Sequence, residues 1–346
     1  MPGEEESVMQ QLSLTRRDLL KGAAAAGGLA AAGTLLGPLA VLAEQESDGD
    51  SMAFGPWSPP QPIGELASTH SDYHPAISRD GRSLYFTTDR DAPSFPAEIV
   101  VSQREDREAP WGPPVAVDAL NRAGFNSGVP NLQPKGHVIY FNSNRPGGAG
   151  AGDLYVAWRD DRRDDFGWQP PVPLPGQVNT TASESGPTYF KDPATDLTRL
   201  YFTRFSGKGS LGEASQDWDI YVSLQADDGS FGAGQIVPTL NSPYGPPWSR
   251  DTRTAIRRDG LEMFVTTNRH AGQATPTENI WVATRPDTTT EDWTMSAQAD
   301  PNLNSGQGDG GPALSWDGTT LYFFSQRTAS GKPGKRQLWM STRERL

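Results

Sequence analysis

A small set of acidic residues, with one histidine, recurs at matching places along the chain and offers the first candidates for chemistry. The candidate catalytic residues are Asp72, His74, Glu184, Asp251 and Asp309. Two carboxylates at a suitable spacing can act as acid and base in glycan cleavage. Clustered carboxylate oxygens also suit Ca²⁺, so Asp72, Glu184 and Asp309 are candidate ligands of a divalent cation, with His74 as a base or a further ligand.

A structural role for the same carboxylates is equally consistent with their positions. Each one comes just before an expected strand, where an acidic side chain can accept hydrogen bonds from the backbone of its own turn. The sequence leaves both alternatives open.

The elements that position these residues form a repeat. Five copies align on Pro75, Pro130, Pro187, Thr254 and Pro312, which are 55 to 67 residues apart. Each copy has a short strand, a polar turn such as Asp80-Gly81, a second strand with an aromatic pair such as Tyr85-Phe86, and a third strand. A period of this length is typical of stacked supersecondary units.

A fourth segment, rich in Trp and Pro, follows each copy except the last. An extra segment of this kind, residues 54–60, precedes the first copy. We therefore expect residues 54–346 to form a five-bladed β-propeller of four-stranded antiparallel blades. Its inner strands start near residues 72, 127, 184, 251 and 309, and the N-terminal outer strand closes the ring against residues 338–342.

The repeated segments GPALSWDGTTLYFFSQR and GDLYVAWR resemble the WD-repeat-like repeats of the TolB-type propeller family. That resemblance implies the propeller fold. Members of the family serve as interaction platforms, ligand-binding modules and, less often, enzymes, so the resemblance does not by itself assign an activity.

Ligands of propellers usually bind at the channel mouth, where the loops that enter the inner strands and the loops between second and third strands meet. Two of these loops, residues 205–218 and 242–253, are longer than their counterparts. The expected ligand-binding residues there are Trp218, Tyr244, Trp248, Asp251 and Arg253, because an aromatic wall beside charged groups can stack a sugar ring or a cation. Alternatively, the aromatic side chains only pin the loops to the blades.

Two further sets of repeated polar residues have expected structural roles. The arginines that close the second strands should pair with the acid or amide that opens the third strand, such as Asp153; they are Arg90, Arg145, Arg269 and Arg327. The asparagines at equivalent turns should satisfy backbone groups; they are Asn121, Asn179, Asn241 and Asn304.

The N-terminal segment is an export signal by its pattern. Arg16-Arg17 precedes an Ala/Gly-rich run that ends in Ala43, which resembles a twin-arginine signal. We expect residues 1–43 to be cleaved, residues 44–53 to be a disordered linker, and the mature protein to be periplasmic or secreted. A retained membrane anchor is the alternative.

Composition excludes several classes of function. The chain of 346 residues has no cysteine, which excludes disulfides, thiolate metal sites and cysteine nucleophiles, and its formal net charge of −12 argues against nucleic acid. The leading expectation is a monomeric binding module for a saccharide or a cell-envelope protein that is not an enzyme and has no membrane span after signal cleavage. The alternatives are a glycan hydrolase or lyase that uses the mouth carboxylates, and a structural propeller whose channel holds water or Ca²⁺.

Overall fold

A computed structural model describes most of the chain beyond the N-terminal segment. The described residues are 53–90, 97–205, 218–242, 250–269, 277–298, 302–328, 330 and 334–346. The expected signal, residues 1–43, and all but the last residue of the expected linker lie outside them. None of the helical structure within the described ranges is long and apolar enough to cross a membrane.

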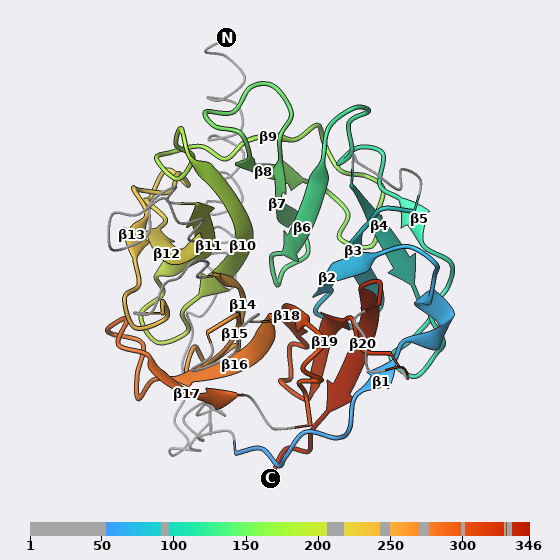
Figure 1. Ribbon diagram of the computed structural model, residues 1–346. Helices are drawn as coiled ribbons and strands as arrows, with labels where there is room; N and C mark the ends of the chain where they lie inside the picture. The colour runs from blue at the N-terminus through green and yellow to red at the C-terminus, as the bar shows by residue number, and fades with distance from the viewer. Residues whose placement is uncertain are drawn as a thin grey trace, which may run out of the picture.

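The described chain forms a ring of five four-stranded antiparallel sheets, which confirms the expected five-bladed propeller (Figure 1). Blade 1 contains β2 (Asp72–Ile77), β3 (Ser83–Thr88), β4 (Glu98–Gln103) and β5 (Val115–Ala116). Blade 2 contains β6 (Ser127–Leu132), β7 (Val138–Ser143), β8 (Asp153–Trp158) and β9 (Val172–Pro173). Blade 3 contains β10 (Ser183–Lys191), β11 (Thr198–Phe205), β12 (Trp218–Leu224) and β13 (Gln235–Ile236). Blade 4 contains β14 (Asp251–Ile256), β15 (Glu262–Thr267), β16 (Asn279–Thr284) and β17 (Thr294–Gln298).

Blade 5 joins the two ends of the chain. It contains β18 (Asp309–Leu314), β19 (Thr320–Ser325), β20 (Gln337–Thr342) and the N-terminal strand β1 (Gln61–Pro62), which is followed by the 3-10 turn η1 (Gly64–Leu66). β1 pairs with β20 through Gln61 opposite Met340. The closure expected from the orphan N-terminal segment is therefore confirmed, and it leaves proline on an outer edge, where a missing amide costs nothing.

The core lies between the blades, and the second strand of each blade supplies most of it. Successive side chains of a strand point to opposite faces. In β3, Tyr85 packs toward blade 2 with Phe141 and Trp168, whereas Leu84 and Phe86 pack toward blade 5. The residues at these two positions, an aromatic pair in four blades and Phe264-Val265 in blade 4, therefore bind each blade to both of its neighbours.

The repeated asparagines hold the third strand of each blade. Asn121 accepts a hydrogen bond from the Ile99 amide and donates one to the Ile99 carbonyl, both at 2.9 Å. The same double contact joins Asn179 to Leu154, Asn241 to Ile220, and Asn304 to Ile280. The structural role expected for these asparagines is confirmed.

A buried ion pair links blades 1 and 2. The Asp165 carboxylate lies 2.6 Å from Nη1 of Arg159, and both side chains are almost fully buried. The Tyr85 hydroxyl and the Gln103 amide of blade 1 each donate to the same carboxylate at 2.7 Å. Removing Asp165 would leave the Arg159 charge buried without its partner.

We expect Asp165→Ala to lower the free energy of unfolding by about 3–5 kcal/mol, the usual cost of removing one partner of a buried pair. Urea unfolding measures this loss. The control is Asp160→Ala, an exposed carboxylate nearby, which should change stability by less than about 0.5 kcal/mol. Equal effects of the two variants would contradict the proposed role of Asp165.

Candidate functional site

The four acidic candidates are buried inside their own blades. Asp72, Glu184, Asp251 and Asp309 are all 0% exposed. Each forms an ion pair of 2.6 to 2.8 Å with the arginine that ends the second strand of the same blade; these arginines are Arg90, Arg204, Arg269 and Arg327. The pairing expected between such arginines and third-strand acids is wrong: Asp153 accepts hydrogen bonds from the Ala149 and Gly150 amides instead.

The remaining oxygens of these carboxylates are also occupied. Asp309 accepts a 2.6 Å hydrogen bond from the Ser305 amide, Asp251 accepts one of 2.6 Å from the Ser242 amide, and Asp72 accepts one of 2.6 Å from the Ser68 hydroxyl. These contacts fit the structural role that the sequence left open, in which each acid stabilises its own turn. The three candidate cation ligands lie in different blades, and no group of three or more His, Asp or Glu in the described part of the chain is placed to hold a metal.

Two residues after each of the four buried acids, and after Ser127 at the matching position of blade 2, the inner strand has a bulge. The five bulge residues all have positive φ: His74 (53°), Val129 (52°), Gly186 (60°), Arg253 (41°) and Gly311 (62°). Three of the five are not glycine, and such residues adopt this conformation only where the surroundings hold them there. All five line the central channel, so we call them the bulge ring.

Threonines of the preceding blade hold three of the bulges. The amides of Val129 and Gly311 each donate a 2.9 Å hydrogen bond to a threonine hydroxyl, of Thr87 and Thr266 respectively, and Arg253 donates one of 3.3 Å to Thr203. The matching position in blade 5 is Phe324, opposite Gly310. Its ring lies edge-on to the His74 ring, with centroids 5.8 Å apart.

The two glycines of the bulge ring make room for its two polar side chains. A Cβ atom on Gly311 would lie 3.0 Å from Cδ2 of His74, and a Cβ on Gly186 would lie 3.4 Å from Cγ of Arg253. Glycine at these positions therefore allows the histidine and the arginine to extend over the neighbouring blades.

His74 is buried and both of its ring nitrogens lack a hydrogen-bond partner within the described chain. The residue is 5% exposed, and its ring lies edge-on to Tyr73 at 4.6 Å between centroids. Burial, followed by the charges of Arg253 and Arg336, lowers the pKa of His74 well below its ordinary value. The imidazole is therefore neutral at neutral pH, with one nitrogen able to accept a proton.

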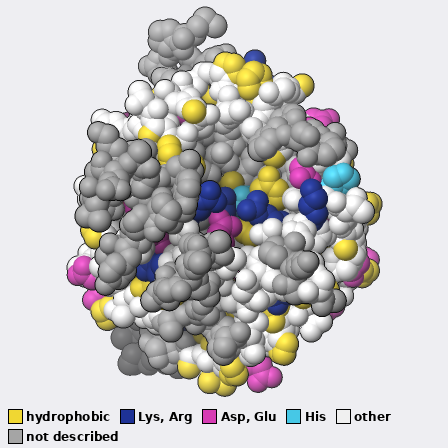
Figure 2. Space-filling view, viewed as in Figure 1, with side chains coloured by type: hydrophobic (Ala, Val, Ile, Leu, Met, Phe, Trp, Pro, Cys, Tyr) yellow, Lys and Arg dark blue, Asp and Glu magenta, His cyan; other side chains and the backbone are white. Residues whose placement is uncertain are grey.

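Three arginines surround one carboxylate beside the bulge ring. Glu278 lies 3.7 Å from Nη1 of Arg250, 4.0 Å from Nη1 of Arg253 and 3.7 Å from Nη2 of Arg336. Burial lowers the pKa of Arg253 to about 10, with Glu278 opposing and Arg336 adding to the effect, so its guanidinium keeps its charge at neutral pH. Figure 2 shows basic side chains gathered with acidic ones near the middle of this face.

Glu278 and Arg336 were missed by the sequence analysis. Each lies one residue before the third strand of its blade, at the same register as Trp218 in blade 3. Blades 1 and 2 carry only Ala97 and Gly152 at that position. The sequence does contain a signal for them: the residue just before the third strand is small in blades 1 and 2 and large in blades 3, 4 and 5.

The expected aromatic wall is only partly described. Trp218 forms a bridge with Arg250, and its ring centroid lies 5.3 Å from that of Phe205. Tyr244 and Trp248 lie outside the described residues. Asp251 and Arg253, expected to bind ligand together, differ in environment: Asp251 pairs with Arg269 inside its blade, whereas Arg253 lines the channel.

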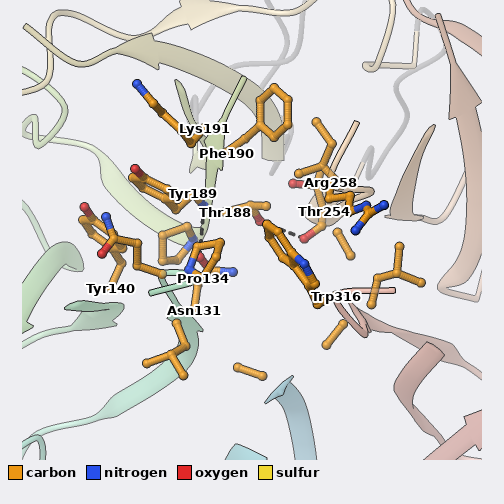
Figure 3. Close-up of a pocket in the computed structure, with 18 of the residues that line it drawn as sticks. Asn131, Pro134, Tyr140, Thr188, Tyr189, Phe190, Lys191, Thr254, Arg258 and Trp316 are labelled. Carbon is orange, nitrogen blue, oxygen red and sulfur yellow. Dashed lines mark hydrogen bonds between the residues drawn. The ribbon is translucent and has the colours of Figure 1, made fainter. Parts of the chain in front are cut away.

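A cavity extends from the bulge ring toward the turns between first and second strands, which is the end opposite to the expected ligand face. This cavity of about 1700 Å³ has aromatic walls (Figure 3). Tyr140 and Tyr189 stack with ring centroids 5.9 Å apart. Arg79 lies over the Trp316 ring at 4.4 Å. Flat rings of this kind suit the faces of sugars.

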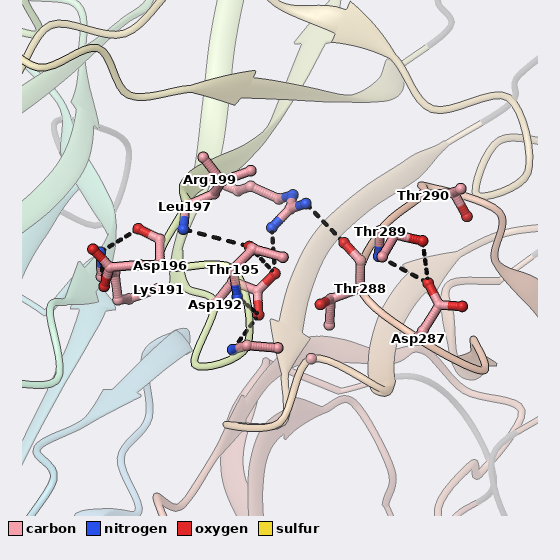
Figure 4. A network of polar contacts seen from close by, with 12 residues as sticks. Lys191, Asp192, Thr195, Asp196, Leu197, Arg199, Asp287, Thr288, Thr289 and Thr290 are labelled. Atoms are coloured by element: carbon pink, nitrogen blue, oxygen red, sulfur yellow. Dashed lines mark hydrogen bonds and ion pairs between the residues drawn. The ribbon is translucent and has the colours of Figure 1, made fainter.

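One of the acidic residues that line this cavity, Asp192, belongs to the scaffold. Asp192 pairs with Arg199 at 3.0 Å, and Arg199 also donates to the Thr288 carbonyl of blade 4 (Figure 4). Although burial acts to raise it, hydrogen bonds from Thr195 and the neighbouring groups lower the pKa of Asp192 to about 2. Asp192 therefore stays ionised and links two blades.

Comparison with known proteins finds likeness in fold. No family model matches the chain, and no curated protein matches it. A thermostable family-43 glycoside hydrolase is 13% identical with a TM-score of 0.57, covering 81% of this chain and 91% of its own. An α-L-arabinofuranosidase from Lactobacillus brevis is 14% identical with a TM-score of 0.53, covering 82% and 94%. The catalytic domain of a GH62 α-L-arabinofuranosidase from Coprinopsis cinerea is 12% identical with a TM-score of 0.53, covering 84% and 97%.

These likenesses correct the leading functional expectation. They argue against a binding module without enzymatic activity, because the solved structures that share this fold are named as glycoside hydrolases. At 12–14% identity the likeness shows the fold alone, so the activity has to be argued from the site.

The packing of His74 against Gly311 can be tested with a matched pair of glycines. Gly311 and Gly306 both have positive φ, but a Cβ atom on Gly306 would meet nothing within 4 Å. We expect Gly306→Ala to cost about 1 kcal/mol of backbone strain, and Gly311→Ala to cost about 1–3 kcal/mol more because it crowds His74 and Phe324. Thermal unfolding measures both, and equal losses would contradict the tight contact.

The lowered pKa of His74 predicts acid sensitivity. Below about pH 6.5 the unfolded chain binds a proton at this histidine that the folded chain does not. Stability should therefore fall with decreasing pH, by up to about 1.4 kcal/mol per pH unit from this group. His74→Asn removes the titration, and asparagine tolerates positive φ.

We expect the free energy of unfolding to fall less steeply in His74→Asn than in the wild type between about pH 6.5 and pH 5. Urea unfolding at each pH measures the slopes. His70→Asn, which changes a histidine outside the channel cavity, is the control for loss of a histidine. A wild-type slope in His74→Asn would show that the folded protein protonates His74 normally.

Proposed function

We propose that this protein is a glycan-active enzyme whose reaction centre is the bulge ring, with His74 as the residue that moves a proton. The observation that carries the proposal is the buried His74 imidazole, neutral and without a partner at either ring nitrogen in the described chain. A neutral imidazole has a free nitrogen lone pair, which is what a general base needs to accept a proton.

The surroundings of His74 support this role. Its backbone is held at a φ of 53°, a costly conformation that the surroundings must impose, and the residue lines the channel. Arg253 of the same ring carries a positive charge that can stabilise negative charge developing on a substrate. The aromatic cavity beyond the ring, with Tyr189 and Trp316 among its walls, offers space for further sugar units.

The arrangement differs from the usual pair of catalytic carboxylates in glycoside hydrolysis, which lie about 5–10 Å apart. The acids at the start of the inner strands are occupied by arginines, and Glu278 is the carboxylate that lies beside the bulge ring. Cleavage with one base fits the described residues better than displacement by two carboxylates. His74 would take a proton either from a water that attacks the anomeric carbon or from a sugar carbon whose electrons then form a double bond. In both cases the glycosidic bond breaks and its oxygen leaves with a proton from solvent, while Arg253 stabilises the negative charge that develops.

The likeness in fold to solved glycoside hydrolases supports the same proposal. We further infer that the enzyme acts outside the cytoplasm, because the Arg16-Arg17 segment resembles an export signal. Such a location would give it access to polysaccharides of cell walls and envelopes.

The test is a screen of the full chain against arabinan, xylan, pectin and other polysaccharides containing uronic acids. New reducing ends measure bond cleavage, and ultraviolet absorbance of an unsaturated product distinguishes elimination from hydrolysis. We expect His74→Asn to lower kcat by about 10²–10⁴-fold, the usual contribution of a general base. His70→Asn should retain wild-type activity.

Two results would overturn the proposal. Absence of cleavage by the wild type across the panel would remove the enzymatic function. Wild-type kcat in His74→Asn, with cleavage present, would move the reaction centre away from the bulge ring.

A further inference from the structure

The region beside the bulge ring concentrates positive charge in a chain that is acidic as a whole. The formal net charge of the chain is −12, yet Arg250, Arg253 and Arg336 gather around the single carboxylate of Glu278. Among the described residues, the three guanidinium groups and one carboxylate of this cluster together carry an excess of two positive charges. A local field of this sign attracts anionic ligands.

The contacts within this arginine cluster are long compared with the ion pairs of the scaffold. The nitrogen–oxygen distances to Glu278 are 3.7, 4.0 and 3.7 Å, whereas Asp72, Asp251 and Asp309 lie 2.8, 2.6 and 2.8 Å from their arginines. Glu278 thus lies beyond normal hydrogen-bond distance in these three pairs. It balances part of the charge without satisfying these donors.

Several buried donors of the cluster have no acceptor within the described chain. They are Nε and Nη1 of Arg253 and Nε of Arg336. A buried donor without a partner costs about 1–3 kcal/mol, so a ligand acceptor that reaches these donors would be bound favourably. The planar fork of a guanidinium matches the two oxygens of a carboxylate.

The two arginines nearest to His74 are held in place by packing. The Arg336 guanidinium lies over the Tyr73 ring at 5.4 Å and over the Phe324 ring at 5.0 Å. The same two rings contact His74, and the Arg253 side chain packs beside Gly186. Side chains fixed in this way lose little entropy when a ligand binds.

We propose that Arg253 and Arg336, with Arg250 beside them, bind the carboxylate of a uronic acid unit in the glycan substrate. This inference rests on the proposed function, because it takes the bulge ring as the glycan site. Since Arg336 and His74 share the rings of Tyr73 and Phe324, a carboxylate on Arg336 brings its sugar next to the proposed base. The arginine cluster then selects acidic glycans over neutral ones.

Binding of defined oligosaccharides to the full chain tests this inference without requiring turnover. The probes are oligogalacturonate and an oligosaccharide containing glucuronic acid, their neutral galactose and glucose counterparts, and a sulfated oligosaccharide of equal length. Isothermal titration calorimetry measures the affinities. We expect a uronate probe to bind at least about tenfold more tightly than its neutral counterpart, a preference that weakens as salt is added.

Variants locate the binding site. Arg336→Gln should weaken uronate binding by at least about tenfold, as expected for loss of a charge-assisted pair, and Arg336→Lys should restore part of the affinity by keeping the charge without the fork. The control is Arg107→Gln, which changes an exposed arginine paired with Asp317 near the turn between β2 and β3. It should bind as the wild type does, and melting temperatures verify that each variant is folded.

The outcomes separate this inference from the proposed function. Equal binding of acidic and neutral probes, tighter binding of the sulfated probe, or wild-type affinity in folded Arg336→Gln would each overturn the uronate site. Cleavage of neutral glycans without any preference for uronates would overturn this inference and leave the proposed function standing. Arg336-dependent uronate binding without cleavage of any glycan would support this inference and contradict the proposed function.

Discussion

The ion pair between the acid that opens an inner strand and the arginine that ends the next strand is the interaction on which the channel depends. In blade 4, Asp251 binds Arg269 at 2.6 Å, and the same arginine donates to the Leu240 carbonyl. This joins the start of the inner strand to the end of the second strand and to the incoming chain. Because this ion pair is buried, breaking it costs far more than breaking a surface pair. The ion pair therefore helps to hold the next residues of the inner strand in their strained, positive-φ conformation.

The bulge two residues after the ion pair determines which side chain each blade contributes to the channel. A bulge adds an unpaired residue to a strand and redirects its side chain. Where the bulge residue is glycine it leaves space, and where it is His74 or Arg253 it places a polar group in the channel. The five blades therefore share one scaffold while their contributions to the channel differ, which is how a symmetric fold can carry an asymmetric site.

The five blades, the closure by β1 and the asparagine contacts could be predicted from the sequence, because they follow from repeats and local turn chemistry. It could not decide the role of Asp72, since a carboxylate at that position is equally suited to a turn, an ion pair or catalysis. The arginine partner was mispredicted because proximity in sequence favoured the third strand. The antiparallel register instead puts Asp72 opposite Thr88, within reach of Arg90. Glu278 and Arg336 were missed because they lie just outside the repeated motif.

The threonine pattern breaks in two blades, at Asn142 of blade 2 and Phe324 of blade 5, and the break at Phe324 explains why the polar groups gather where they do. Blades 1, 3 and 4 use a threonine hydroxyl to hold the next bulge, but blade 5 has Phe324 at that position. An aromatic ring cannot accept that hydrogen bond as a hydroxyl does, yet it gives His74 and Arg336 a common apolar surface. A neutral imidazole and a charged guanidinium can then lie close together, because the ring separates the imidazole from water while the arginine opposes its protonation. The same substitution therefore accounts for both the neutral state of His74 and the placement of the positive charge beside it.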